Sequence, residues 1–336
     1  MRPLSRALAT ACLVACLACT SAPSAGAAPA SGTTGTGPPL RSWTPAFLAS
    51  VSAPDAAPIG TNDWSCRPSA AHPYPVILIH GTWENALSTW SGMAPWLKRD
   101  GHCVYAIDFG KSNPLEQGGP LTITPGAYGA RPIERSAKEV AAFVRQVLAH
   151  TGARKADLVG HSQGGLLIRQ MLRFEGLAGS TDKVVTIAAT NHGTTMDGLG
   201  ALDRILRDRL GMDLDPVLNH VVGVSGVQQI YDSPLLRTLA AGGDTEPGIS
   251  YTVLATRYDE VSTPYDRTFL TAGPGATVDN VTIQDGCPQD LSEHLSVDYS
   301  PRAIDWVRRA LDHARMPLAS IRCTATVPFF GDSEAR

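Results

Sequence analysis

One short segment in the middle of the chain, Gly160-His161-Ser162-Gln163-Gly164, constrains the fold more than any other feature. It follows an apolar run, residues 156 to 159, and precedes a helix candidate, residues 166 to 174. A serine in a sharp turn between a strand and a helix exposes its hydroxyl, and small residues two positions before and after it let strand and helix approach closely. Gly160 and Gly164 hold those two positions. The segment therefore predicts a nucleophile elbow with Ser162 at its tip.

Short apolar runs alternate with helical patterns along the chain on both sides of this elbow. The runs are rich in Val, Ile and Leu, are bounded by turn residues and are too short for helices. The predicted strands are Pro75 to Ile79, Cys103 to Ile107, Ala156 to Val159, Val184 to Ala188, Tyr251 to Ala255 and Val278 to Ile283. The predicted helices are Ser136 to His150, Leu166 to Phe174 and Pro301 to Leu311. This alternation predicts an α/β domain with a mainly parallel central sheet and helices on both faces.

A long insertion, residues 194 to 245, interrupts the pattern between the fourth and fifth predicted strands. It has no strand pattern but is too long for a structureless loop inside a compact domain. Leucines recur three or four residues apart opposite charged residues, which predicts an amphipathic helix through Leu199, Leu202, Leu206 and Leu210. We interpret the insertion as a helical cap or lid. The apolar face alone leaves open whether it meets lipid surfaces or stays packed over the core.

The N-terminus has the pattern of a secretory signal peptide. A basic start is followed by an apolar run, residues 7 to 19, that is too short to span a bilayer, and Ala25 and Ala27 form a cleavage pattern. We predict a signal peptide over residues 1 to 27, a disordered spacer over residues 28 to 42 and a catalytic domain over residues 43 to 336. Acylation of Cys16 as a lipoprotein is the alternative.

The cysteines support export. Three of the seven lie in the leader, which leaves Cys66, Cys103, Cys287 and Cys323, an even number suited to an oxidising compartment. Three pairings are open, and we prefer Cys66 with Cys103 and Cys287 with Cys323 because each pair would fasten a terminal or loop segment beside a strand end. Neither closely spaced Cys/His pairs nor an oxygen-rich calcium loop occurs in the sequence, so we predict no metal.

Composition limits the partners. With 43% hydrophobic residues among 336, the chain has material for one large core. Its 28 basic and 31 acidic residues, a net charge of −3, provide no basic field to attract nucleic acid. We expect a monomer whose partner is a substrate molecule.

A serine nucleophile needs a histidine base and an acid that orients the histidine. Behind a nucleophile elbow the chain order is serine, acid, histidine. His294 lies in the loop between the last predicted strand and helix, whereas His313 lies at that helix's end, so we take His294 as the base. For the acid we take Asp259, just after the fifth predicted strand, with Glu260 as its immediate rival.

The oxyanion formed during attack needs backbone donors. One predicted donor is Gln163, the residue after the nucleophile. The other is Thr82, in the His80-Gly81-Thr82 loop after the first predicted strand.

Several segments together resemble the secreted class 2 lipases of actinobacteria. They are HGT at 80–82, GHSQGG at 160–165, NHGT at 191–194, TRYDEVSTPY at 256–265 and DLSEHL at 290–295. The resemblance spans about residues 64 to 311 and implies an α/β-hydrolase fold. It places Ser162, Asp259 and His294 on the family's triad and Thr82 and Gln163 on its oxyanion positions, and it implies the preferred disulfides.

The resemblance also implies hydrolysis of lipid esters through an acyl-enzyme, without a cofactor, by a secreted enzyme that contacts lipid surfaces transiently. A carboxylesterase for short soluble esters, or an acyltransferase to an alcohol of the cell envelope, would use the same triad. A binding module that keeps the fold without catalysis is the hypothesis from another class. An intact elbow, histidine, acid and oxyanion loop argue against that last hypothesis.

Overall fold

A computed structural model describes residue 35, residues 37–195 and residues 215–334. Its centre is a sheet of six parallel strands in the order β2-β1-β3-β4-β5-β6. The strands are β1 Val76–Ile79, β2 Val104–Ile107, β3 Ala156–His161, β4 Thr181–Ile187, β5 Ser250–Ala255 and β6 Thr277–Thr282. All six predicted strands are confirmed, with ends that differ by up to three residues.

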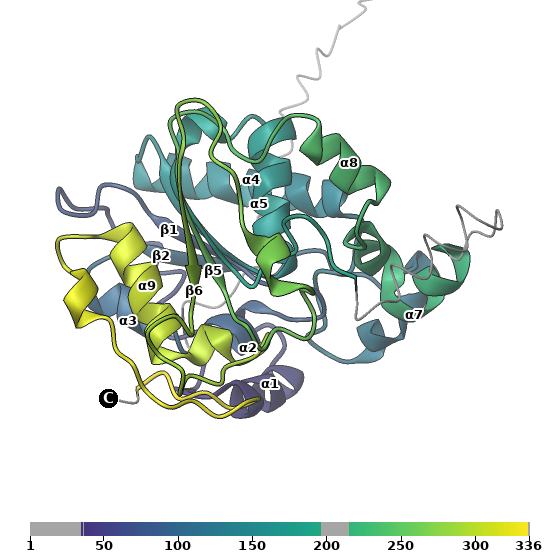
Figure 1. Ribbon diagram of the computed structural model, residues 1–336, viewed down its shortest axis with the longest axis horizontal. Helices are drawn as coiled ribbons and strands as arrows, with labels where there is room; N and C mark the ends of the chain where they lie inside the picture. The colour runs from purple at the N-terminus through teal and green to yellow at the C-terminus, as the bar shows by residue number, and fades with distance from the viewer. Residues whose placement is uncertain (1–34, 36, 196–214, 335–336) are drawn as a thin grey trace, which may run out of the picture.

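Helices cover both faces of this sheet, as predicted (Figure 1). They are α1 Trp43–Ser52, α2 Ala86–Trp90, α3 Ala94–Arg99, α4 Ile133–Thr151, α5 Gln163–Phe174, α7 Asp215–Gln228, α8 Pro234–Ala240 and α9 Pro301–Leu311. Helices α4 and α5 pack on one face through an apolar core that includes Phe143 and Met171. Helices α2, α3 and α9 pack on the other face around Trp90 and Ile304. Because both faces are covered, the central strands β1 and β3 are buried throughout.

The described part of the predicted insertion contains α7 and α8. Helix α7 is interrupted at Gly223, whose φ of 72° and ψ of 166° are not helical. Backbone bonds tie α7 and the residue that follows it to neighbouring loops, from Val224 N–H to the Gln117 carbonyl at 2.8 Å and from Thr194 N–H to the Gln229 carbonyl at 2.9 Å. The predicted amphipathic helix through Leu199 to Leu210 lies outside the described residues, as do the predicted signal peptide and most of the spacer.

Two disulfides close loops of similar length, Cys66–Cys103 with a sequence separation of 37 and Cys287–Cys323 with a separation of 36. These are the two preferred pairs. The second disulfide fastens the segment after α9 to the loop that follows β6. Among the described residues no helix is both long and apolar enough to cross a bilayer. The described residues also contain no group of three or more His, Cys, Asp or Glu side chains that could hold a metal ion.

Candidate active site

The carboxyl ends of the parallel strands bring the predicted site residues to one edge of the sheet. Ser162 directly follows β3, and Thr82 lies three residues after β1. Asp259 lies after β5 and His294 after β6. Loops at the carboxyl ends of a parallel sheet form the crevice where such folds bind ligands. Four segments that are far apart in the sequence therefore meet at one point.

Ser162 occupies a strained turn between β3 and α5. Its backbone has φ 52° and ψ −123°, a left-handed conformation that a residue with a Cβ seldom adopts. Close backbone approaches around the turn explain the two glycines. A Cβ on Gly160 would lie 2.6 Å from the backbone of Gly164, and one on Gly164 would lie 2.2 Å from the carbonyl oxygen of Ile79. The turn holds the Ser162 hydroxyl at the end of the strand, as an elbow requires.

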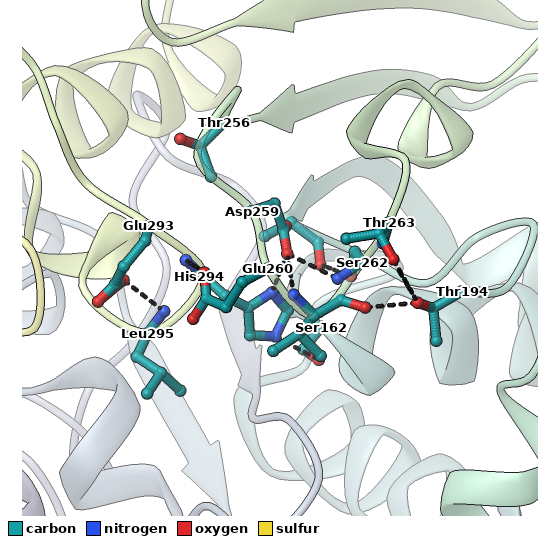
Figure 2. A network of polar contacts seen from close by, with 12 residues as sticks. Ser162, Thr194, Thr256, Asp259, Glu260, Ser262, Thr263, Glu293, His294 and Leu295 are labelled. Carbon is teal, nitrogen blue, oxygen red and sulfur yellow. Dashed lines mark hydrogen bonds and ion pairs between the residues drawn. The ribbon is translucent and has the colours of Figure 1, made fainter. Parts of the chain in front are cut away.

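A chain of hydrogen bonds links Ser162, His294 and Asp259 (Figure 2). The Ser162 Oγ lies 3.0 Å from His294 Nε2, and His294 Nδ1 lies 2.9 Å from Asp259 Oδ1. Asp259 Oδ1 also accepts the backbone N–H groups of Val261, at 2.9 Å, and Ser262, at 2.6 Å. These backbone bonds fix the carboxylate. The carboxylate in turn fixes the tautomer of His294 with its proton on Nδ1, so Nε2 can accept the serine proton.

Opposing effects act on the pKa of His294. Burial disfavours the imidazolium, but the adjacent Asp259 carboxylate favours it more strongly, so the pKa lies above its ordinary value. The rival acid Glu260 forms no hydrogen bond with the imidazole ring. Its Oε2 accepts the backbone N–H of His294 at 3.3 Å instead. His313 is exposed beyond the end of α9, away from Ser162.

Side-chain amides hold Thr82, one of the two predicted oxyanion donors, in place beside the other donor, Gln163. Gln163 is the first residue of α5, where backbone N–H groups have no partner within the helix. Its side chain donates to Thr82 Oγ1 at 3.1 Å and to the Gly129 carbonyl at 2.9 Å. Gln229, which follows α7, donates to the same Thr82 oxygen at 2.9 Å. These bonds hold Thr82 beside the elbow.

Comparisons with known proteins agree with this geometry. A family model described as "alpha/beta hydrolase fold" matches residues 74–210. The structure of Aspergillus fumigatus lipase B superposes with a TM-score of 0.58 at 20% sequence identity, covering 78% of this chain and 60% of that one. The chain has the α/β-hydrolase fold.

Two curated relatives of this chain are named triacylglycerol lipase. The one from Pseudarthrobacter phenanthrenivorans is 29% identical over 243 residues, which cover 70% of this chain and 66% of the relative. The one from Burkholderia plantarii is also 29% identical over 243 residues, which cover 70% of this chain and 59% of the relative. The chain thus spans slightly less than two thirds of the length of these relatives.

A largely apolar cavity of about 150 Å³ opens beside Ser162. Ser162 and His294 lie on its wall together with Thr82 and Trp83. Besides Trp83, its apolar side chains come from α7 and from the loops after β5 and β6, and they are Val222, Val261 and Leu295. A substrate with an apolar chain beside its reactive carbonyl would fit such a cavity.

Sequence analysis missed three residues of this region. Gln229 donates a hydrogen bond to Thr82, and Glu84 and Asp298 contact the ring of His161 behind the elbow. Position in the chain could have pointed only to Glu84, which lies in the loop after β1 close to Thr82. Gln229 and Asp298 have no local pattern that marks them. They join the region only through tertiary contacts.

Proposed function

We propose that this chain is a secreted serine ester hydrolase that acts on lipid esters, a triacylglycerol lipase. The observation that carries the proposal is the hydrogen-bonded chain from Asp259 through His294 to Ser162, which ends at the wall of an apolar cavity. Nucleophile, base and acid of this kind activate a hydroxyl that is otherwise unreactive at neutral pH.

In the proposed mechanism Ser162 Oγ attacks the ester carbonyl carbon while His294 Nε2 takes the hydroxyl proton. Asp259 stabilises the imidazolium that forms. The backbone N–H groups of Thr82 and Gln163 donate to the oxyanion, a contribution of roughly 3 kcal/mol per donor. As the tetrahedral intermediate collapses, His294 gives its proton to the leaving alcohol. Water, deprotonated by His294, then releases the acid from the acyl-enzyme.

Lipid esters are the proposed substrates because the cavity is largely apolar and because two relatives are named triacylglycerol lipase. Similarity to the class 2 lipases of actinobacteria points to the same chemistry. Secretion is supported by the pattern of residues 1–27 and by the two disulfides, which persist in oxidising compartments. We propose a monomer that needs no cofactor and contacts lipid surfaces transiently.

A series of p-nitrophenyl esters from acetate to palmitate tests the proposal, with the Ser162→Ala variant as the control. We expect kcat/KM to rise with acyl-chain length, together with increased activity above the solubility limit of the substrate. The Ser162→Ala variant should lose the activity by a factor on the order of 10⁵ or more. Hydrolysis of acetyl and butyryl esters alone would identify a short-chain carboxylesterase instead.

Labelling with a fluorophosphonate separates catalysis from binding. We expect the wild-type chain to be labelled and the Ser162→Ala variant to remain unlabelled. Absence of labelling in the wild-type chain would contradict every enzymatic proposal. Analysis of the products with a competing alcohol would show whether the acyl group passes to water or to the alcohol.

A further inference from the structure

His161, the residue before Ser162, lies behind the elbow with a fully buried side chain. Its Nδ1 lies 2.9 Å from Glu84 Oε2 and 3.3 Å from Asp298 Oδ2. Its Nε2 lies 2.9 Å from the backbone carbonyl oxygen of His294. One side chain adjacent to the proposed nucleophile thus contacts the residue that bears the proposed base.

The partners of the two ring nitrogens determine the charge of His161. A carbonyl oxygen only accepts hydrogen bonds, so Nε2 must carry a proton to bond His294. Nδ1 faces Glu84 Oε2, which already accepts the backbone N–H of Gly81 at 2.9 Å and the hydroxyl of Thr89 at 3.1 Å. Glu84 Oε2 thus accepts two hydrogen bonds before His161 is counted, which favours its ionised form, an acceptor only. Both ring nitrogens therefore donate, and the ring is an imidazolium.

The electrostatic surroundings agree with this assignment. Burial opposes a charge on His161, but Asp298 and Glu84 outweigh it and raise the pKa of His161 to about 10. Burial likewise opposes a charge on Glu84, but His161 lowers the pKa of Glu84 to about 2. Burial raises the pKa of Asp298 to about 7. Buried charges persist when they are paired and hydrogen-bonded in this way.

Two further groups complete the surroundings of His161. His80 is neutral near pH 7, because burial lowers its pKa to about 4, and its Nδ1 bonds the Gly81 carbonyl. Glu293 is occupied by the backbone N–H groups of Leu295 and Ser296, each at 2.9 Å. Among the described residues, neither His80 nor Glu293 forms a hydrogen bond with the His161 ring.

We propose that His161 is a cationic positioning residue, which hydrogen-bonds the backbone carbonyl of His294 and so fixes the base against Ser162. The segment between β6 and the short 3-10 helix Val297–Tyr299 has no helix or strand and only isolated β-bridges at Asp290 and Glu293, so side-chain bonds of this kind contribute to where His294 lies. A bond from a charged donor is about twice as strong as a neutral one. The proposal rests on the proposed function, because it assigns His161 to the positioning of that triad.

The cation has a second effect on the same base. The rings of His161 and His294 lie 4.9 Å apart, and the positive charge of His161 opposes protonation of His294. Four carboxyl groups interact electrostatically with these two histidines, namely Glu84, Asp259, Glu260 and Asp298. Removal of the cation leaves them uncompensated, which raises the pKa of His294. The acid limb of kcat/KM would then move to higher pH.

Nitrogen-15 NMR of the histidine side chains in the full chain tests the charge directly. At pH 8.5 we expect one histidine to keep both ring nitrogens protonated, and we expect its resonance to vanish in His161→Gln. In Glu84→Gln, which removes one carboxylate, the same ring should lose its proton at lower pH. Absence of a doubly protonated histidine in the unaltered chain would overturn the proposal whether or not any variant folds.

Kinetics of His161→Gln on a soluble p-nitrophenyl ester test the positioning. We expect kcat to fall by a factor on the order of 10² with little change in KM, because a small displacement of a catalytic group has such an effect. The acid limb should also move to higher pH. The matched control is His102→Gln. His102 is buried just before β2, at the amino end of the strands, whereas Ser162 lies at their carboxyl end. The loss of His102 should leave kcat and the pH profile unchanged.

Two failures are distinguishable. If the wild-type chain neither hydrolyses esters nor reacts with a fluorophosphonate, the proposed function is wrong, whatever the NMR spectrum shows. If the wild-type chain is active and folded His161→Gln keeps its kcat and its acid limb, the positioning role is wrong and the proposed function stands.

Discussion

At the scale of single residues, the elbow shows how backbone geometry selects amino acids. Ser162 keeps a positive φ because β3 and α5 hold it on both sides, and strain of this kind persists only where the surroundings enforce it. Gly164 is needed for another reason. Its Cα packs against the backbone of β1, where a methyl group would overlap the carbonyl oxygen of Ile79.

Gly164→Ala tests this packing. We expect the free energy of unfolding to fall by about 3 kcal/mol, because backbone cannot move aside for the added methyl group. Urea unfolding followed by circular dichroism measures the change. The matched control is Gly179→Ala, where a Cβ would meet no atom within 4 Å, and it should leave stability within about 0.5 kcal/mol. Equal effects of the two variants would refute the packing argument.

The choice between the two neighbouring acids also belongs to this scale. Asp259 forms a hydrogen bond with the His294 ring, whereas Glu260 forms one with the backbone N–H of that residue. We expect Asp259→Asn to lower kcat by a factor on the order of 10⁴, because an amide favours the wrong imidazole tautomer. Glu260→Gln should retain most of the wild-type rate. Steady-state kinetics with a soluble ester would reveal the reverse order if Glu260 were the acid.

At the scale of elements, α7 closes one side of the cavity. Bonds from its neighbours hold it over the sheet edge, and its Val222 faces the cavity while Val221, one position earlier, is 57% exposed. The wall therefore depends on which face of this helix turns inward. The cavity shape in turn determines which acyl chains can lie beside Ser162.

Val222→Phe tests the role of α7 in chain-length preference. A larger side chain should fill part of the cavity, so kcat/KM for octanoyl and longer esters should fall about tenfold or more relative to acetyl esters. Val221→Phe places the same ring on the exposed face and should leave the chain-length profile as it is. A parallel loss for both variants, measured with the same ester series, would mean that the cavity does not hold the acyl chain.

At the scale of the whole molecule, buried ionisable groups couple stability to pH. The folded pKa of His161 is about 10 and that of His294 lies above its ordinary value, so both bind protons more tightly in the folded chain. Their contribution is complete below the unfolded pKa of about 6.5 and disappears as pH rises through the folded pKa. Burial raises the pKa of Asp298 to about 7, so this group also lowers the free energy of unfolding as pH rises, but mainly below pH 7.

Stability should therefore decline on the alkaline side of neutrality. Between pH 6.5 and about 9.5 we expect the free energy of unfolding to fall by roughly 2 to 4 kcal/mol, with His161 as the main cause. Urea unfolding at fixed ionic strength and intact disulfides measures it. His161→Gln should flatten the dependence over this range. A free energy that stays level or rises with pH in the wild-type chain would contradict the assignment.

The local sequence was sufficient for the six strands, the helices α4, α5 and α9 and the elbow. Hydrophobic periodicity acts within a few residues, and the elbow needs only its two glycines, its serine and the adjacent strand and helix. The order of Ser162, Asp259 and His294 along the chain followed from the same pattern. An even number of cysteines restricted the disulfides to three pairings, of which the structure contains the preferred one.

Tertiary structure alone decided which carboxylate meets the ring of His294, which face of α7 lines the cavity and what surrounds His161. These contacts join residues that are distant in the chain, 77 positions apart for His161 and Glu84 and 133 for His161 and His294. A sequence pattern reports on neighbours within one turn or one strand. Charge in a buried site depends on all the groups that fold around it, so it appears only when the parallel strands bring those groups to one edge.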